Sequence, residues 1–81
     1  MKILDLNSKQ KLNNISIFLT KEEILQMKSY LDDLIKNPSH QHSHFSSEDY
    51  KNEITLWLYE INSIDTLPKK VQEFIKYDKW T

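Results

Sequence analysis

Four residue types are absent from this sequence of 81 residues: cysteine, glycine, alanine and arginine. Without cysteine the chain forms no disulfides, and it offers neither a thiolate ligand for zinc nor a cysteine nucleophile. No apolar run approaches the roughly 20 residues of a membrane-spanning helix, and the segment after Met1 does not resemble a signal peptide. These absences favour a cytoplasmic protein without a membrane segment.

The lack of arginine bears on nucleic-acid binding. All 11 basic residues are lysines, the acidic residues number 12, and the formal net charge is −1. Proteins that bind nucleic acid usually present a basic face, and arginine supplies the paired donors that recognise guanine and phosphate. Nucleic-acid binding is therefore not expected.

The lack of glycine leaves the turns to other residues. Asparagine and aspartate tolerate positive φ best among the residues that remain, so we expect them at left-handed backbone positions. Six asparagines separate apolar segments of ordinary element length, at Asn7, Asn13, Asn14, Asn37, Asn52 and Asn62.

The chain length fits a single domain, 1–81. A core of this size rarely supplies more than about 3 to 5 kcal/mol of stability. Because no disulfide can add to that margin, we expect the protein to form a homo-oligomer.

The clearest predicted element is a helix that begins after Thr20. Thr20 and Glu23 have the spacing of a capping box, in which each side chain accepts a hydrogen bond from the other residue's backbone N–H. Apolar residues then recur at helical spacing, at Ile24, Met27, Leu31, Leu34 and Ile35. Pro38 ends this pattern, so the helix is predicted to stop before it.

Alternating apolar residues predict strands at Ile15–Leu19 and Glu53–Tyr59. Two further strands are predicted at Lys2–Leu6 and His42–Ser46. In each strand, successive side chains should point to opposite faces of a sheet. The aliphatic face of Glu53–Tyr59 is expected to pack against the helix.

A second helix is predicted to begin at Asp65 or Thr66, with Pro68 in its first turn. Its apolar positions have helical spacing, at Leu67, Val71, Phe74 and Ile75. The element order is then ββαββα, or βαββα if the first strand is coil. This order predicts an α+β fold with an antiparallel sheet of three to four strands and two helices on one face.

Strand alternation also predicts an aromatic surface. Phe18, Trp57 and Tyr59 should point away from the aliphatic core, and Phe45 lies in the neighbouring candidate strand. Tryptophan and tyrosine dominate the energetic centres of protein interfaces, so these residues are candidate contacts with a protein partner or a second subunit. In the alternative interpretation, the second helix and the C-terminal tail cover the rings.

His40, His42 and His44 form the main cluster of potential metal ligands. Alternate residues of a strand share a face about 6.6 Å apart, so His42 and His44 could hold zinc or another transition metal. A site with all three histidines would need a bent loop. A polar edge strand and a pH-sensitive interface are the alternatives, since histidine changes charge near neutral pH.

Lys69 and Lys70 lie in the first turn of the second predicted helix. Free backbone N–H groups and two ammonium groups could bind the phosphate or carboxylate of an anionic small molecule, with His42 and His44 contributing and an aromatic ring stacking on a base. The alternative is that both lysines are ordinary solvated side chains.

Catalytic patterns are lacking: we find no glycine-rich phosphate loop and no serine in a catalytic motif. The adjacent pairs Glu22 with Glu23 and Asp32 with Asp33 should point about 100° apart on a helix. They are predicted to form a solvated face and not an acid and base pair. We therefore expect a protein that is not an enzyme.

A resemblance to known proteins rests on four segments: Ile-Ser-Ile-Phe-Leu-Thr-Lys-Glu-Glu at 15–23, Asn37-Pro38, the His-x-His stretch and Glu53-Ile54-Thr55. This pattern resembles small uncharacterised proteins of Gram-positive bacteria, their phages and other mobile elements, over about Ile15 to Ile75. The resemblance implies that the protein is of the same kind as immunity-type and counter-defence proteins, which act by binding and blocking a partner. It implies no site residues.

These features predict a non-enzymatic binding protein, an oligomeric inhibitor or immunity-type protein that blocks a protein partner. Two alternatives remain open at this point. One is a protein that sequesters a phosphorylated small molecule or nucleotide, and the other is a metal-binding domain built on the histidines.

Overall fold

The computed structural model describes all 81 residues. The chain forms two compact units, one made of residues 1–17 and 60–81 and the other of residues 18–59. Both units contain helix and strand, so the predicted α+β class is confirmed. None of the helices has the length and apolar character that crossing a membrane requires. The single domain 1–81 stays a prediction.

The elements follow one another in the order strand, strand, helix, strand, strand, helix, with two short 3₁₀ helices inserted. They are β1 (Ile3–Asp5), β2 (Gln10–Leu12), α1 (Lys21–Lys36), η1 (Pro38–His40), β3 (His42–Ser46), β4 (Glu53–Trp57), η2 (Ile61–Thr66) and α2 (Lys69–Tyr77). The predicted order ββαββα is matched in part, because the second strand lies earlier in the chain than expected.

Helix α1 begins with the predicted capping box. The Thr20 hydroxyl accepts a hydrogen bond from the Glu23 backbone N–H at 3.1 Å, and Glu23 Oε1 accepts one from the Thr20 N–H at 2.9 Å. Glu23 Oε2 also accepts from the Glu48 backbone N–H at 2.9 Å, which ties the β3–β4 turn to the start of the helix. Glu23 is buried, so the expectation that it belongs to a solvated face is wrong.

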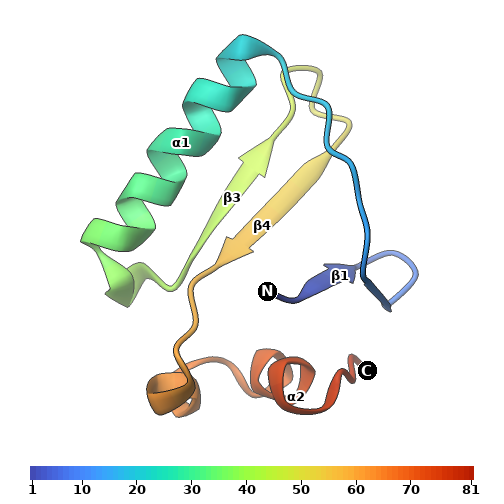
Figure 1. The fold of residues 1–81 in the computed structure, drawn as a ribbon, viewed down its shortest axis with the longest axis vertical. Coiled ribbons are helices and arrows are strands. Elements are labelled where there is room, and N and C mark those ends of the chain that lie inside the picture. The colour runs from blue at the N-terminus through green and yellow to red at the C-terminus, as the bar shows by residue number, and fades with distance from the viewer. The chain divides into compact units, whose positions relative to one another are not determined.

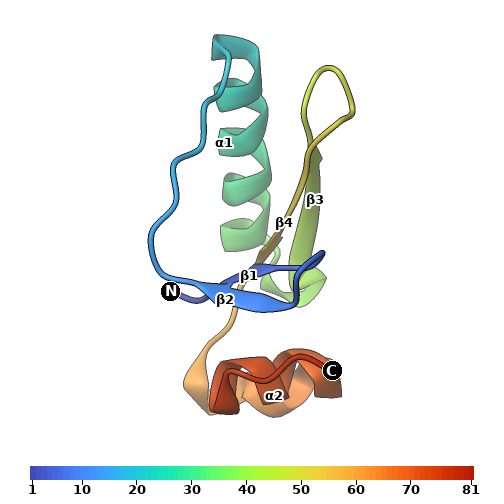
Figure 2. The same ribbon diagram turned by 90° about the vertical axis from the view of Figure 1, so that its right-hand side faces the viewer.

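Strands β3 and β4 form an antiparallel hairpin that lies alongside α1 (Figure 1). The pairing places Phe45 opposite Ile54, and Phe45 is 2% exposed. Its ring and the ring of Tyr30 on α1 meet edge to face, with centroids 6.2 Å apart. Figure 2, turned by 90°, shows α1 on one side of this hairpin. The face of β3 and β4 that carries Phe45 is therefore the core face, and α1 covers it.

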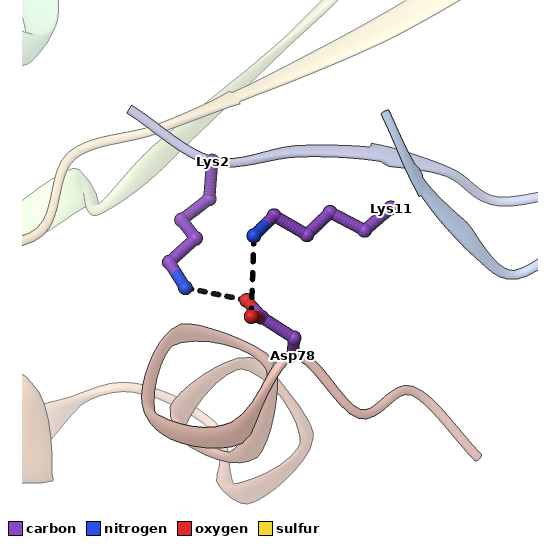
Figure 3. A network of polar contacts seen from close by, with 3 residues as sticks. All are labelled: Lys2, Lys11 and Asp78. Carbon is purple, nitrogen blue, oxygen red and sulfur yellow. Dashed lines mark hydrogen bonds and ion pairs between the residues drawn. The ribbon is translucent and has the colours of Figure 1, made fainter. Parts of the chain in front are cut away.

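In the other unit, β1 and β2 pair antiparallel, with Ile3 opposite Leu12. The buried apolar residues of this unit come from η2, α2 and the segment between them: Ile64, Leu67, Val71 and Phe74. Asp78, at the C-terminal cap of α2, forms ion pairs with Lys2 before β1 and with Lys11 on β2 (Figure 3). The Lys11 Nζ to Asp78 Oδ2 distance is 3.2 Å. These hydrogen bonds from Lys2 and Lys11 lower the pKa of the Asp78 carboxyl.

Three fold expectations are wrong. No strand forms at Ile15–Leu19, and the sheet of three to four strands is replaced by two sheets of two strands each. A strand needs a partner to satisfy its backbone groups, and alternation alone does not supply one.

Helix α2 begins at Lys69 and not at Asp65 or Thr66, because a residue before proline avoids the helical region. Leu67 is accordingly extended, with φ −84° and ψ 159°.

The left-handed backbone positions also differ from expectation. Positive φ values occur at Lys9, Gln41, Tyr50 and Asp78, and not at any asparagine. Of these residues only aspartate is among those that tolerate this region well. The surrounding turns therefore impose the conformation on three residues that do not favour it.

Candidate binding surface

The hairpin face that points away from α1 gathers polar and aromatic side chains. The β3–β4 register places His42 opposite Trp57 and His44 opposite Thr55. Paired residues of antiparallel strands point to the same face, and alternate residues share that face. Glu53 precedes Thr55 on the same side of β4. We call these five residues, His42, His44, Glu53, Thr55 and Trp57, the His-Trp surface.

The centre of the His-Trp surface is an aromatic stack. The rings of His42 and Trp57 lie 4.3 Å apart between centroids, with an angle of 25° between their planes. The rings of His44 and His42 meet edge to face, with centroids 5.2 Å apart. Trp57 and His42 are only partly exposed, so each ring limits the motion of the other.

The rim of the surface is polar. His44 Nδ1 lies 3.1 Å from Thr55 Oγ1 and 3.3 Å from Glu53 Oε1. The side chains of His44 and Glu53 are 60% and 64% exposed. The surface thus offers a ring stack beside hydrogen-bonding groups that water can reach.

The predicted aromatic residues do not form one sheet surface. Trp57 lies on β4 as expected, but Tyr59 lies two residues beyond the end of that strand. Phe18 precedes the α1 cap outside any strand and is 92% exposed. Phe45 is a core residue under α1, because it points to the opposite face from Trp57. Of the four candidates, only Trp57 belongs to the His-Trp surface.

The histidines are only partly brought together. His42 and His44 share a face, as their spacing predicts, whereas His40 lies in η1, where its Nδ1 is 3.0 Å from Asp33 Oδ2. This contact lowers the pKa of Asp33, and the hydrogen bond from Asn37 adds to the effect. No three histidine, aspartate or glutamate side chains are arranged to hold a metal ion. The metal interpretation of His42 and His44 therefore has two candidate ligands, whereas protein zinc sites use at least three.

The predicted anion-binding residues belong to different units. Lys69 and Lys70 begin α2 in the first unit, and His42 and His44 lie in the second. The Lys70 ammonium lies over the Trp80 ring, 4.8 Å from its centroid, where a cation–π interaction holds it. Lys70 thus has a contact within its own unit, which favours a structural role for this side chain.

Two residues of the His-Trp surface were missed by the sequence reasoning: Glu53 and Thr55. The signal was present, because two adjacent strands joined by a short turn are expected to pair as a hairpin. Pairing His42–Ser46 with the following strand would have placed Thr55 and Glu53 beside the histidines. Alternation within a single strand gives the face of each residue but not its neighbours across the sheet.

No protein-family model matches the chain, and no curated protein or solved structure is detectably similar to it.

Proposed function

We propose that the chain is a non-enzymatic binding protein that blocks a protein partner, and that it contacts this partner through the His-Trp surface. The observation that carries the proposal is the stack of His42 on Trp57 on the face that α1 leaves uncovered. Tryptophan is among the residues that most often dominate binding energy at protein interfaces. A blocking protein needs only to occupy its partner's surface, which requires no chemical step.

The restricted motion of the Trp57 ring supports a role in partner binding. A side chain that is already ordered loses less conformational entropy when a partner binds, so more of the contact energy appears as affinity. His42 restricts the indole on one side, and His44, which contacts Thr55 and Glu53, lies against His42. This arrangement has an aromatic centre and a polar rim, which is the usual composition of a protein interface.

The resemblance to immunity-type and counter-defence proteins supports binding and blocking as the mode of action. We include in the proposal that the active form is a homo-oligomer in the cytoplasm. A small domain without disulfides gains stability from association with a second copy.

Affinity capture from extracts of the cells that encode the protein tests the proposal. The bait is the full chain, compared with Trp57→Ala and His44→Ala, and Tyr50→Asn is the matched control. Tyr50 is an aromatic residue of the same unit that is 86% exposed in the β3–β4 turn. We expect one protein to be retained by the wild type and by Tyr50→Asn and to be depleted with both surface variants.

Circular dichroism of each variant shows that the bait is folded. A captured protein that is retained equally by all four baits would contradict the assignment of the surface. Retention of no specific protein by the wild type would contradict the proposed function.

A further inference from the structure

Helix α1 carries a stripe of exposed apolar side chains. Ile24, Leu31 and Ile35 are 53%, 44% and 74% exposed. With about 100° per residue, these three positions lie within about 40° of one another on the helix. Leu34, which is buried, lies about 80° around the helix from Ile24, so the stripe is adjacent to the core face and separate from it. Single apolar residues are common on surfaces, whereas apolar residues aligned along one face of a helix are typical of a face that packs against another element.

Two opposite charges flank this stripe on the side away from the core. Lys28 and Asp32 lie about 40° and 80° from Ile24 on that side. Neither residue takes part in the ion pairs of the chain, which join other side chains. A lysine placed four residues before an acidic residue is the weaker order for a pair within one helix. Both charges are therefore available to a second helix.

We infer that α1 packs against α1 of a second copy of this chain, antiparallel and about a two-fold axis. An antiparallel pair that places Ile24 opposite Ile35 of the second copy also brings Leu31 into the contact. Along the helix axes, Lys28 of one copy and Asp32 of the second copy then differ in position by one residue, about 1.5 Å. The two-fold axis repeats this ion pair, so one helix face complements itself.

The charges select this orientation. A parallel pair has its two-fold axis along the helices, so Lys28 of one copy and Asp32 of the other would lie on opposite sides of the contact and could not form an ion pair. An unrelated partner helix would need its own matching pattern, whereas the second copy carries the required pattern by symmetry. Exposed ion pairs contribute little stability, so here they set direction and the apolar stripe supplies most of the affinity.

The inference rests on the homo-oligomer in the proposed function but not on the partner-binding surface. It assigns self-association to α1 and leaves the His-Trp surface available to a different protein. The two assignments can fail separately.

Sedimentation velocity of the full chain over a range of concentrations tests the inference. We expect a species of twice the chain mass of 9.8 kDa. Leu31→Glu should weaken dimerisation at least 10-fold, and Ile61→Glu, at an exposed apolar residue of the other unit, should not change it. Lys28→Glu should also weaken the dimer, and combining it with Asp32→Lys should restore it.

Engineered cysteines test the direction, because the wild type has none. Under oxidising conditions a mixture of Ile24→Cys and Ile35→Cys should form the mixed disulfide dimer in preference to either symmetric dimer. The inference would be overturned if the wild type stays a monomer at all concentrations, or if Leu31→Glu dimerises as tightly as the wild type. A preference for symmetric disulfides would also overturn it. A dimer that Trp57→Ala dissociates while Leu31→Glu leaves it intact would also overturn it.

Discussion

The imidazole of His42 stacks on the indole of Trp57 across the β3–β4 ladder, 4.3 Å between centroids, on the face opposite Phe45. Because successive side chains alternate between the two faces of the hairpin, the two faces carry different groups. One face supplies the core under α1, and the other holds an ordered aromatic group in reach of solvent.

Replacing Trp57 with alanine should lower the free energy of unfolding by about 1 to 3 kcal/mol, because a partly buried ring and its stacking contact with His42 are lost. Trp57→Phe is the matched control and should recover most of the loss. Urea unfolding followed by far-ultraviolet circular dichroism measures both variants. An alanine variant as stable as the wild type would show that the stack does not hold the hairpin.

Acid should weaken the contact between α1 and the β3–β4 turn. The hydrogen bonds from the backbone N–H groups of Thr20 and Glu48 lower the pKa of Glu23 below its ordinary value of 4.5. A carboxyl whose folded pKa is lowered stabilises the fold fully above about pH 5.5, and this stabilisation is lost as the pH falls through 4.5 and then through the folded pKa.

Glu23→Gln isolates this effect from the other carboxyls. The variant should be less stable than the wild type at pH 7, and the difference should shrink as the pH falls toward 3. Chemical unfolding at a series of pH values measures this difference. A difference that does not depend on pH would mean that the charge of Glu23 contributes nothing.

The left-handed residue of the β3–β4 turn offers a stabilising substitution. Tyr50 has φ 59° and an exposed ring, so it has the backbone cost without a packing gain. Asparagine adopts this region more readily, and Tyr50→Asn should raise the free energy of unfolding by up to about 1 kcal/mol. A lower melting temperature for this variant would show that the tyrosine ring contributes a contact.

Asp78 should hold the β1–β2 hairpin against the end of α2. Asp78→Asn keeps a residue suited to φ 57° but loses the attraction to Lys2 and Lys11. Amide hydrogen exchange in β1 and β2 should become faster, and salt should reduce the difference from the wild type.

The control for this prediction is Asp65→Asn, which removes the 3.7 Å pair with Lys76. It should leave exchange in β1 and β2 unchanged. Equal exchange in the wild type and Asp78→Asn would contradict a role for the carboxylate.

Local signals in the sequence predicted the elements that depend on local physics. The capping box at Thr20 and Glu23 forms as expected, and β3 has the predicted bounds His42–Ser46. The strand at Ile15–Leu19 failed because its existence depends on a partner strand, which alternation cannot reveal. Strand β2 was missed for the opposite reason: its residues Gln10–Leu12 have no apolar alternation, and pairing with β1 makes the strand.

The sequence predicted some residues of the His-Trp surface but not how they contact one another. Alternation placed Trp57 away from the core and put His42 and His44 on a shared face. It did not show that these groups lie against one another, because that depends on the register of the hairpin. The other predicted aromatics, Phe18 and Tyr59, needed a continuous sheet that the chain does not form.

The most direct measurement of the central claim is the affinity of the captured partner for the purified wild type, Trp57→Ala and Tyr50→Asn, by titration calorimetry. We predict that Trp57→Ala raises Kd at least about 10-fold, as expected for a tryptophan at the centre of an interface, while Tyr50→Asn leaves Kd unchanged. Equal Kd values for Trp57→Ala and the wild type, with both proteins folded, would contradict recognition through the His-Trp surface.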